Sequence, residues 1–131
     1  MFGRREEEVL GNRLPVVSGG INMNILLVNP HFNGQAEIPP LGLMYLAASL
    51  PGEDYHVEIL DLDLFPAEAG AGLLAARISG GETNILGITA LSNSFGAARE
   101  VCRLVKAMAP EIMTVLGGIH GTILHADIMK D

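Results

Sequence analysis

The sequence predicts a single doubly wound α/β domain built on a parallel sheet. From Met23 onward, short apolar runs of strand type alternate with longer helical runs, which is the pattern of repeated βαβ units. Hydrophobic residues make up 49% of the 131-residue chain and charged residues 18%, so the chain can bury a sizeable core. Aromatic residues reach only 5%, which favours the aliphatic core of a sheet covered by helices on both faces.

Four strands are expected from the short apolar runs that turn residues separate. They are placed at 24–28, 56–60, 84–88 and 112–116. Residues 1–22 show no sustained period, and we expect them to form a flexible N-terminal extension ahead of an α/β domain at 23–131.

Helices are expected between and after these strands. The first begins at Pro39 or Pro40, because proline suits the first helical turn, and it stops at Leu50 before a Pro-Gly pair. The second covers 66–79, and the third follows Ser94 with an apolar stripe until Pro110. The fourth is expected to begin near residue 122 or 123.

The handedness of the connections predicts the topology and the place of the site. Right-handed crossovers leave few arrangements, and the flavodoxin-like strand order 2-1-3-4 is the natural one for four βα units. The sequence stops at Asp131 before any fifth strand, so we expect the sheet to lack one. Ligands in such sheets bind outside the carboxyl ends of the strands where the order reverses. The loops after Val28, Ile88 and Leu116 should therefore carry the function.

The loop after the first strand excludes several common sites. It reads Asn-Pro-His-Phe-Asn-Gly over 29–34, without the three glycines of a dinucleotide turn or the Gly-Lys-Ser/Thr of a triphosphatase. Asn29 and Thr89 stand where a phosphoacceptor receiver domain would need carboxylates. Asp61 and Asp63 close the second strand, and we interpret them as a solvated strand end.

The loop after the third strand is rich in small polar groups. Hydroxyl and amide side chains can bond a neutral polar ligand without filling the crevice. Alternatively, its serines and asparagine only cap the next helix, and the two roles can coexist. The candidate residues are Thr89, Ala90, Leu91, Ser92, Asn93 and Ser94.

The loop after the fourth strand contains three glycines in five residues. One glycine would suffice for a tight turn into the next helix, so the clustering favours close approach of a ligand to the backbone. The residues at this loop are Gly117, Gly118, Ile119, His120, Gly121 and Thr122.

Charge and cysteine content disfavour other kinds of partner. A net charge of −7 repels a phosphate backbone, so no nucleic-acid partner is expected. The apolar runs are too short to cross a bilayer, so no membrane association is expected. Cys102 is the only cysteine and can form neither an internal disulfide nor an iron–sulfur cluster, and a cytoplasmic location fits best.

Five segments in order resemble one known family. They are 23–30, 39–48, 59–63, 86–89 and 115–122. Together they resemble the N-terminal cobalamin-binding domain of class B radical SAM proteins, a family that includes methyltransferases and the anaerobic magnesium-protoporphyrin IX monomethyl ester cyclase. The likeness covers nearly everything from Met23 onward.

The resemblance implies a Rossmann-like domain whose bound cobalamin has its dimethylbenzimidazole tail displaced from cobalt and inserted beside the sheet. Gly117 and Gly118 would line the slot for the tail. The segment 89–91 would stand where related domains carry a Ser-x-Leu. The rim that faces the corrin would be shaped by Pro39, Pro40, Leu41 and Gly42.

His31 is the candidate axial ligand of cobalt. Cobalamin-dependent mutases and methionine synthases carry Asp-x-His-x-x-Gly after the first strand, whereas this chain carries Asn29, Pro30 and His31 there. Asn29 accepts a hydrogen bond but brings no charge, and the radical SAM family usually has no histidine ligand. Coordination of cobalt by His31 and simple packing of its ring beneath the corrin therefore both stay open.

The expected function is that of a cobalamin-binding module of a radical SAM enzyme, for methyl transfer or oxidative cyclisation. The radical SAM domain, with its iron–sulfur cluster and S-adenosylmethionine, is absent from this chain and would act in cis or in trans. A cofactor-free flavodoxin-like interaction domain is the alternative. An enzyme acting alone has little support, because these loops assemble no nucleophile, base and orienting residue.

Overall fold

One parallel sheet organises the chain. The computed structural model describes residues 22–30 and 38–130, so His31 and nearly all of the expected N-terminal extension lie outside the described residues. The sheet has four strands in the order β2-β1-β3-β4, which confirms the predicted order. The strands are β1 (Met23–Asn29), β2 (Tyr55–Asp61), β3 (Ile85–Thr89) and β4 (Met113–Gly117), each within one residue of its predicted place.

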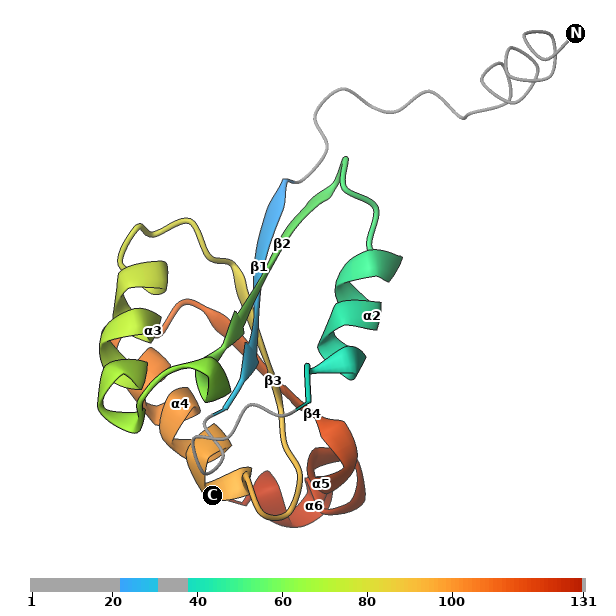
Figure 1. Cartoon of the computed structure of the whole chain (residues 1–131), viewed down its shortest axis with the longest axis vertical. Coiled ribbons are helices and arrows are strands. Elements are labelled where there is room, and N and C mark those ends of the chain that lie inside the picture. The colour runs from blue at the N-terminus through green and yellow to red at the C-terminus, as the bar shows by residue number, and fades with distance from the viewer. Residues whose placement is uncertain (1–21, 31–37, 131) are drawn as a thin grey trace, which may run out of the picture.

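Helices cover the two faces of the sheet unequally. Figure 1 shows α3 and α4 side by side on one face and α2 on the other, with α5 and α6 at the end of the sheet where α2 begins. No helix in the described ranges is long and apolar enough to cross a membrane. The helices are α2 (Leu41–Ser49), α3 (Gly70–Ile78), α4 (Phe95–Met108), α5 (Gly118–Ile123) and α6 (His125–Ile128).

Two predicted helices differ from the structure. The run at 66–79 is not continuous, because a 3₁₀ turn, η2 (Ala67–Ala69), precedes α3. The last helical region begins at Gly118, directly after β4 and four residues before the predicted start at Thr122. Gly118 has a φ of 84°, a left-handed conformation that lets the chain turn from strand into helix without a connecting loop.

The strands alternate their side chains between two cores. Leu26 and Val28 of β1 face α3 and α4, where they pack with Leu86 of β3 in the larger core. Ile25 and Leu27 point the other way and pack under α2 in a smaller cluster. This alternation follows from the two-residue period of a strand. Every strand therefore has an α4 side and an α2 side, and the site described below lies on the α2 side.

Candidate functional site

A row of residues crosses the carboxyl end of the sheet on the α2 side. The pairing register places Asn29 beside Asp61, and Thr89 beside Gly117. Because Val28 pairs with Ile88, Asn29 and Thr89 are neighbours as well. Within the described residues, the strand ends that lead into the predicted site loops are therefore neighbours at the carboxyl end of the sheet.

Asp61 holds the side chain of Asn29. The Asn29 Nδ2 donates to Asp61 Oδ1 at 2.8 Å, and the same oxygen accepts from the Asp63 backbone N–H at 3.1 Å. A carboxylate only accepts hydrogen bonds, so the amide must turn its NH₂ group toward Asp61. Asp61 is part-buried and shapes the site, which corrects its interpretation as a solvated strand end.

The α2 side of β3 is only partly covered although β3 is a central strand. On its α4 side, Leu86 is 0% exposed and Ile88 2%, whereas Gly87 on the α2 side stays partly accessible. On the adjacent β4, Met113 is 60% exposed and Val115 49%. We call this uncovered area the open trench. It consists of Gly87 and Thr89 of β3 with Met113, Val115 and Gly117 of β4.

The trench exists because α2 packs over β1 and β2 and leaves the other half of the sheet free. The Leu27 side chain lies against Gly87, since a Cβ at this position would lie 2.8 Å from Leu27 Cδ2. The floor is therefore backbone and apolar carbon, and the hydroxyl of Thr89 stands at its mouth. Sequence analysis missed Gly87. The available signal was an isolated glycine inside a strand, because such a glycine often marks close approach of another group to the backbone.

The three glycines after β4 serve different purposes. A Cβ on Gly118 would lie 2.5 Å from Ala90 O and 2.8 Å from Ala90 N, so the neighbouring loop itself requires this glycine. A Cβ on Gly121 would lie 3.3 Å from Leu116 O, which is also a packing requirement. Gly117 differs, because a Cβ there would meet no atom nearer than 3.9 Å. Gly117 alone leaves free space that a ligand could use.

The loops after β3 and β4 are joined to each other. The Ala90 N–H donates to Gly117 O at 3.1 Å, and the His120 N–H donates to Ala90 O at 3.2 Å. The His120 Nδ1 lies 3.2 Å from Ser92 Oγ, and its ring lies against Phe95 with centroids 4.3 Å apart. These contacts fix the two site loops as one unit.

Ser94 closes its own loop and does not cap α4 with its side chain. It occupies the N-cap position, but its Oγ accepts from the Leu91 N–H at 3.0 Å. Thr122 is also engaged locally, since its Oγ1 donates to Gly118 O at 2.9 Å within α5. Asn93 is exposed, whereas Pro30 and Ala90 are buried and anchor the backbone of their loops.

Exposed apolar side chains surround the carboxyl end of the sheet. Leu41, at the start of α2, is 53% exposed, Leu91 50% and Ile119 64%. The segment 39–42 bends into α2 through a hydrogen bond from the Leu41 N–H to Pro39 O at 2.8 Å. Figure 1 shows this start of α2 at the same end of the sheet as α5 and the β3–α4 loop. The surface is apolar and offers room for a flat ligand face.

Comparison with known families agrees with this geometry. The family described as "B12 binding domain" matches residues 33–131, which is most of the chain. The chain belongs to the B12-binding domain family. The parallel sheet of order 2-1-3-4 with helices on both faces is the Rossmann-like, flavodoxin-like architecture that the sequence predicted for such a domain.

The chain is also similar to two curated proteins. The chain is 30% identical over 114 residues to an anaerobic magnesium-protoporphyrin IX monomethyl ester cyclase of Rubrivivax gelatinosus, covering 83% of this chain and 20% of that protein. It is 28% identical over 117 residues to the cyclase of the same name from Cereibacter sphaeroides, covering 83% of this chain and 18% of that protein. The chain thus spans about a fifth of these relatives' length. No solved structure matches it significantly.

The open trench is an apolar surface at the carboxyl ends of β3 and β4. Gly117 contributes no side chain, and a Cβ there would meet no atom nearer than 3.9 Å, so a ligand can approach the backbone at this residue. Val115 offers an apolar wall, and Thr89 offers a hydroxyl at the mouth. An apolar cleft with a few polar groups is the usual form of a cofactor site.

Proposed function

We propose that this chain binds cobalamin with the nucleotide tail in the open trench and the corrin across the carboxyl end of the sheet. One observation carries the proposal, namely that the central strand β3 is fully buried on one face and only partly covered on the other. Parallel sheets are normally covered on both faces, so an open central strand calls for something to cover it. The open face lies on β3 and β4, next to the switch point between β1 and β3 where ligands of doubly wound sheets bind.

The tail would be held mainly by apolar contact. Dimethylbenzimidazole would cover the backbone at Gly117 and remove part of Val115 from water. Each buried apolar Å² is worth about 25 cal/mol, so the exposed trench can supply much of the binding energy. The Thr89 hydroxyl at the mouth can bond the polar linker of the tail.

The corrin would lie on the exposed apolar surface around the loops. Leu41, Leu91 and Ile119 offer side chains there, and the Asn29 amide, oriented by Asp61, offers an oxygen as acceptor. The other residues expected at the cofactor are proposed to shape this surface through their backbones and hydrogen bonds. They are Pro30, Pro39, Pro40, Gly42, Ala90, Ser92, Asn93, Ser94, Gly118, His120 and Thr122.

The module would serve a larger radical SAM enzyme. Cobalamin supplies a cobalt centre that carries a methyl group or takes part in another radical step. This chain's part is to bind the cofactor, orient it and cover its tail. The relatives are cyclases by name, and a radical SAM domain, in cis or in trans, would bring the cluster and S-adenosylmethionine. Methyl transfer and oxidative cyclisation both remain candidate reactions.

Retention of cobalamin tests the proposal. The protein is mixed with hydroxocobalamin and passed through a desalting column, and the visible spectrum of the protein fraction is recorded. We expect a coloured fraction with close to one cobalamin per chain. A colourless fraction, with no rise in melting temperature for corrinoids, flavins or nucleotides, would favour the cofactor-free interaction domain instead.

The same preparation tests His31. If His31 coordinates cobalt, His31→Ala shifts the visible bands of the bound cofactor. If its ring only packs beneath the corrin, the spectrum of the bound cofactor stays unchanged. Both results are compatible with cobalamin binding, which the retention of hydroxocobalamin on the desalting column tests.

A further inference from the structure

The side chain of Asn29 has a fixed hydrogen-bonding polarity. Its Nδ2 donates to Asp61 Oδ1 at 2.8 Å, across the register pair that joins the ends of β1 and β2. The same Asp61 oxygen accepts from the Asp63 N–H at 3.1 Å, so the carboxylate is itself held in place. A carboxylate only accepts hydrogen bonds, so the reversed amide would set two acceptor oxygens against each other. Asn29 therefore turns its carbonyl oxygen away from Asp61.

The Asn29 Oδ1 is the atom of this pair that a ligand can use. Among the described residues no donor lies within hydrogen-bond distance of it. Asn29 is partly accessible and lies beside Thr89 at the carboxyl end of the sheet. The Thr89 hydroxyl can donate or accept, so it does not distinguish one polar ligand group from another. Asn29 does, because it offers an acceptor only.

Asp61 places a negative charge directly behind this acceptor. No lysine or arginine in the described part of the chain forms an ion pair with Asp61. A ligand carboxylate at Asn29 would therefore meet neither a donor nor a positive charge. Juxtaposed like charges are costly at a binding site. The pair thus favours a neutral N–H donor over a carboxylate.

The amide side chains of the corrin are neutral N–H donors of this kind. The nucleotide tail of cobalamin leaves the macrocycle on its lower face, and the propionamide side chains stand on that same face. The acetamides stand on the upper face. A domain that holds the tail therefore faces the propionamides, and these are the groups that the strand ends can contact.

We propose that Asn29, positioned by Asp61, selects a corrinoid propionamide against the corresponding carboxylate. The inference rests on the proposed cobalamin binding and names the chemical form of the cofactor that the site accepts. The Asn29 Oδ1 accepts an N–H of one propionamide. Asp61 is a positioning residue, because it acts through Asn29 and does not touch the cofactor. The domain accordingly takes up the amidated corrinoid and discriminates against the acid that lacks this one amide.

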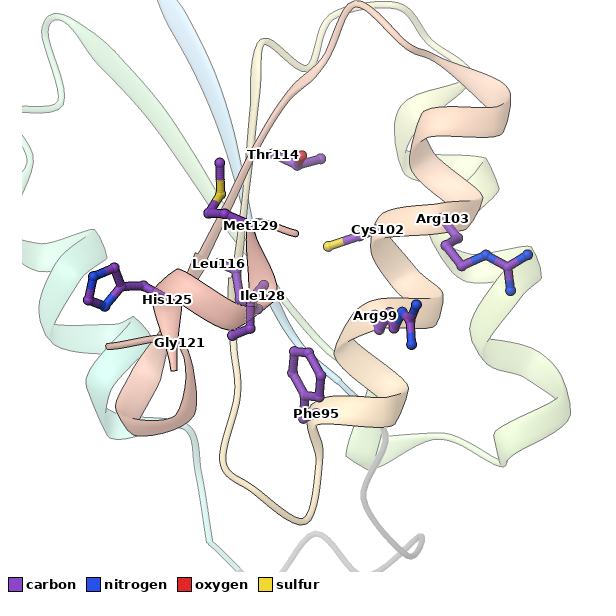
Figure 2. Close-up of a pocket in the computed structure, with 10 residues that line it drawn as sticks. All are labelled: Phe95, Arg99, Cys102, Arg103, Thr114, Leu116, Gly121, His125, Ile128 and Met129. Atoms are coloured by element: carbon purple, nitrogen blue, oxygen red, sulfur yellow. The ribbon is translucent and has the colours of Figure 1, made fainter. Parts of the chain in front are cut away.

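A groove on the other face of the sheet would have the opposite preference. Figure 2 shows it between α4 and β4, with Arg99 and Arg103 projecting from α4. As far as the chain is described, the lining of this groove includes both arginines and no carboxylate. Arginine binds carboxylates through strong charge-assisted hydrogen bonds, so a corrinoid seated there would bind at least as well as an acid. A preference for the amide therefore also indicates which face holds the cofactor.

Affinities for matched corrinoids test the selection. Hydroxocobalamin and its b-, d- and e-monocarboxylic acids, each with one propionamide converted to a carboxylate, are titrated into the full chain at neutral pH. We expect one isomer to bind at least about tenfold more weakly than hydroxocobalamin, and the others to bind within about threefold of it. The net charge of −7 acts on all the acids alike, so a difference between isomers isolates the local effect.

Asp61→Asn removes the constraint on the Asn29 amide. An amide at position 61 can donate as well as accept, so Asn29 can turn its NH₂ group toward a ligand carboxylate. We expect weaker binding of hydroxocobalamin and tighter binding of the disfavoured acid, with an affinity ratio of about twofold or less. A merely structural role of Asp61 would weaken both ligands alike. Glu100→Gln on α4 is the control, since it removes a negative charge on the other face and should keep the ratio.

The Asn29 side chain gives a second readout in the unmodified, cofactor-free protein. The proton that bonds to Asp61 should exchange with water at least about fivefold more slowly than the side-chain amide protons of Asn93, which is exposed. NMR of the side-chain amides measures both rates in one sample. Equal rates would show that Asp61 does not hold the amide and would overturn the inference without any variant.

Other outcomes overturn the inference while the proposed function stands. They are equal affinity for hydroxocobalamin and all the acids, a uniform loss for all the acids, and an affinity ratio that Asp61→Asn leaves unchanged. A chain that binds none of the corrinoids would instead contradict the proposed function and the inference with it. The affinity for hydroxocobalamin itself thus separates the two failures.

Discussion

Gly118→Ala is expected to lower the free energy of unfolding by about 3 kcal/mol. An L-residue in the left-handed conformation costs roughly 1–2 kcal/mol, and Gly118 has a φ of 84°. Its new Cβ would also lie 2.5 Å from Ala90 O, a backbone atom that cannot move aside alone, and overpacking costs typically about 1–3 kcal/mol. Urea denaturation followed by circular dichroism measures the loss.

The control for this substitution is Gly72→Ala. Gly72 lies in α3 with open space around its Cβ position, so alanine there should stabilise the helix by about 0.5–1 kcal/mol. The two substitutions add the same methyl group and should have opposite signs. Equal effects would show that the loops after β3 and β4 do not pack against each other as described.

Gly117→Val is expected to abolish cobalamin retention while the domain stays folded. Gly117 has an extended backbone with a φ of −119°, and a Cβ there would meet nothing nearer than 3.9 Å, so the backbone and the Cβ of valine fit this position. The branched side chain would stand at the mouth of the open trench and exclude the tail. We expect the affinity for hydroxocobalamin to fall by at least about 100-fold, which corresponds to about 2.7 kcal/mol.

Titration of the cofactor and urea denaturation are both needed for this variant. Gly72→Val adds the same side chain on the exposed surface of α3 and should retain cobalamin, although valine weakens the helix slightly. A Gly117→Val protein that binds cobalamin as tightly as the unmodified chain would place the tail elsewhere. The placement of the corrin would then need revision as well.

The strands and their order could be predicted because hydrophobic burial and chain handedness determine them. The run at Leu26 to Val28 is buried in the core and reads as a strand without any tertiary information. Right-handed crossovers then leave few alternatives to the observed order. The place of the site followed from that order, since its loops lie at the carboxyl ends of the strands.

Features that depend on contacts between segments could not be predicted. The early start of α5 rests on the conformation of Gly118, which its packing against Ala90 imposes. The bond between Asn29 and Asp61 requires the register of two strands that are 32 residues apart in the sequence. The open trench exists only because α2 covers half of its face, and no local pattern encodes that extent.

The affinity ratio of hydroxocobalamin to cobinamide tests the central claim most directly. Cobinamide has the corrin but lacks the nucleotide tail, so it can use the surface around the loops but not the open trench. Isothermal titration of the unmodified protein with each corrinoid should give at least about 100-fold tighter binding of hydroxocobalamin. Equal affinity for the two would show that the trench does not receive the tail and would contradict the account.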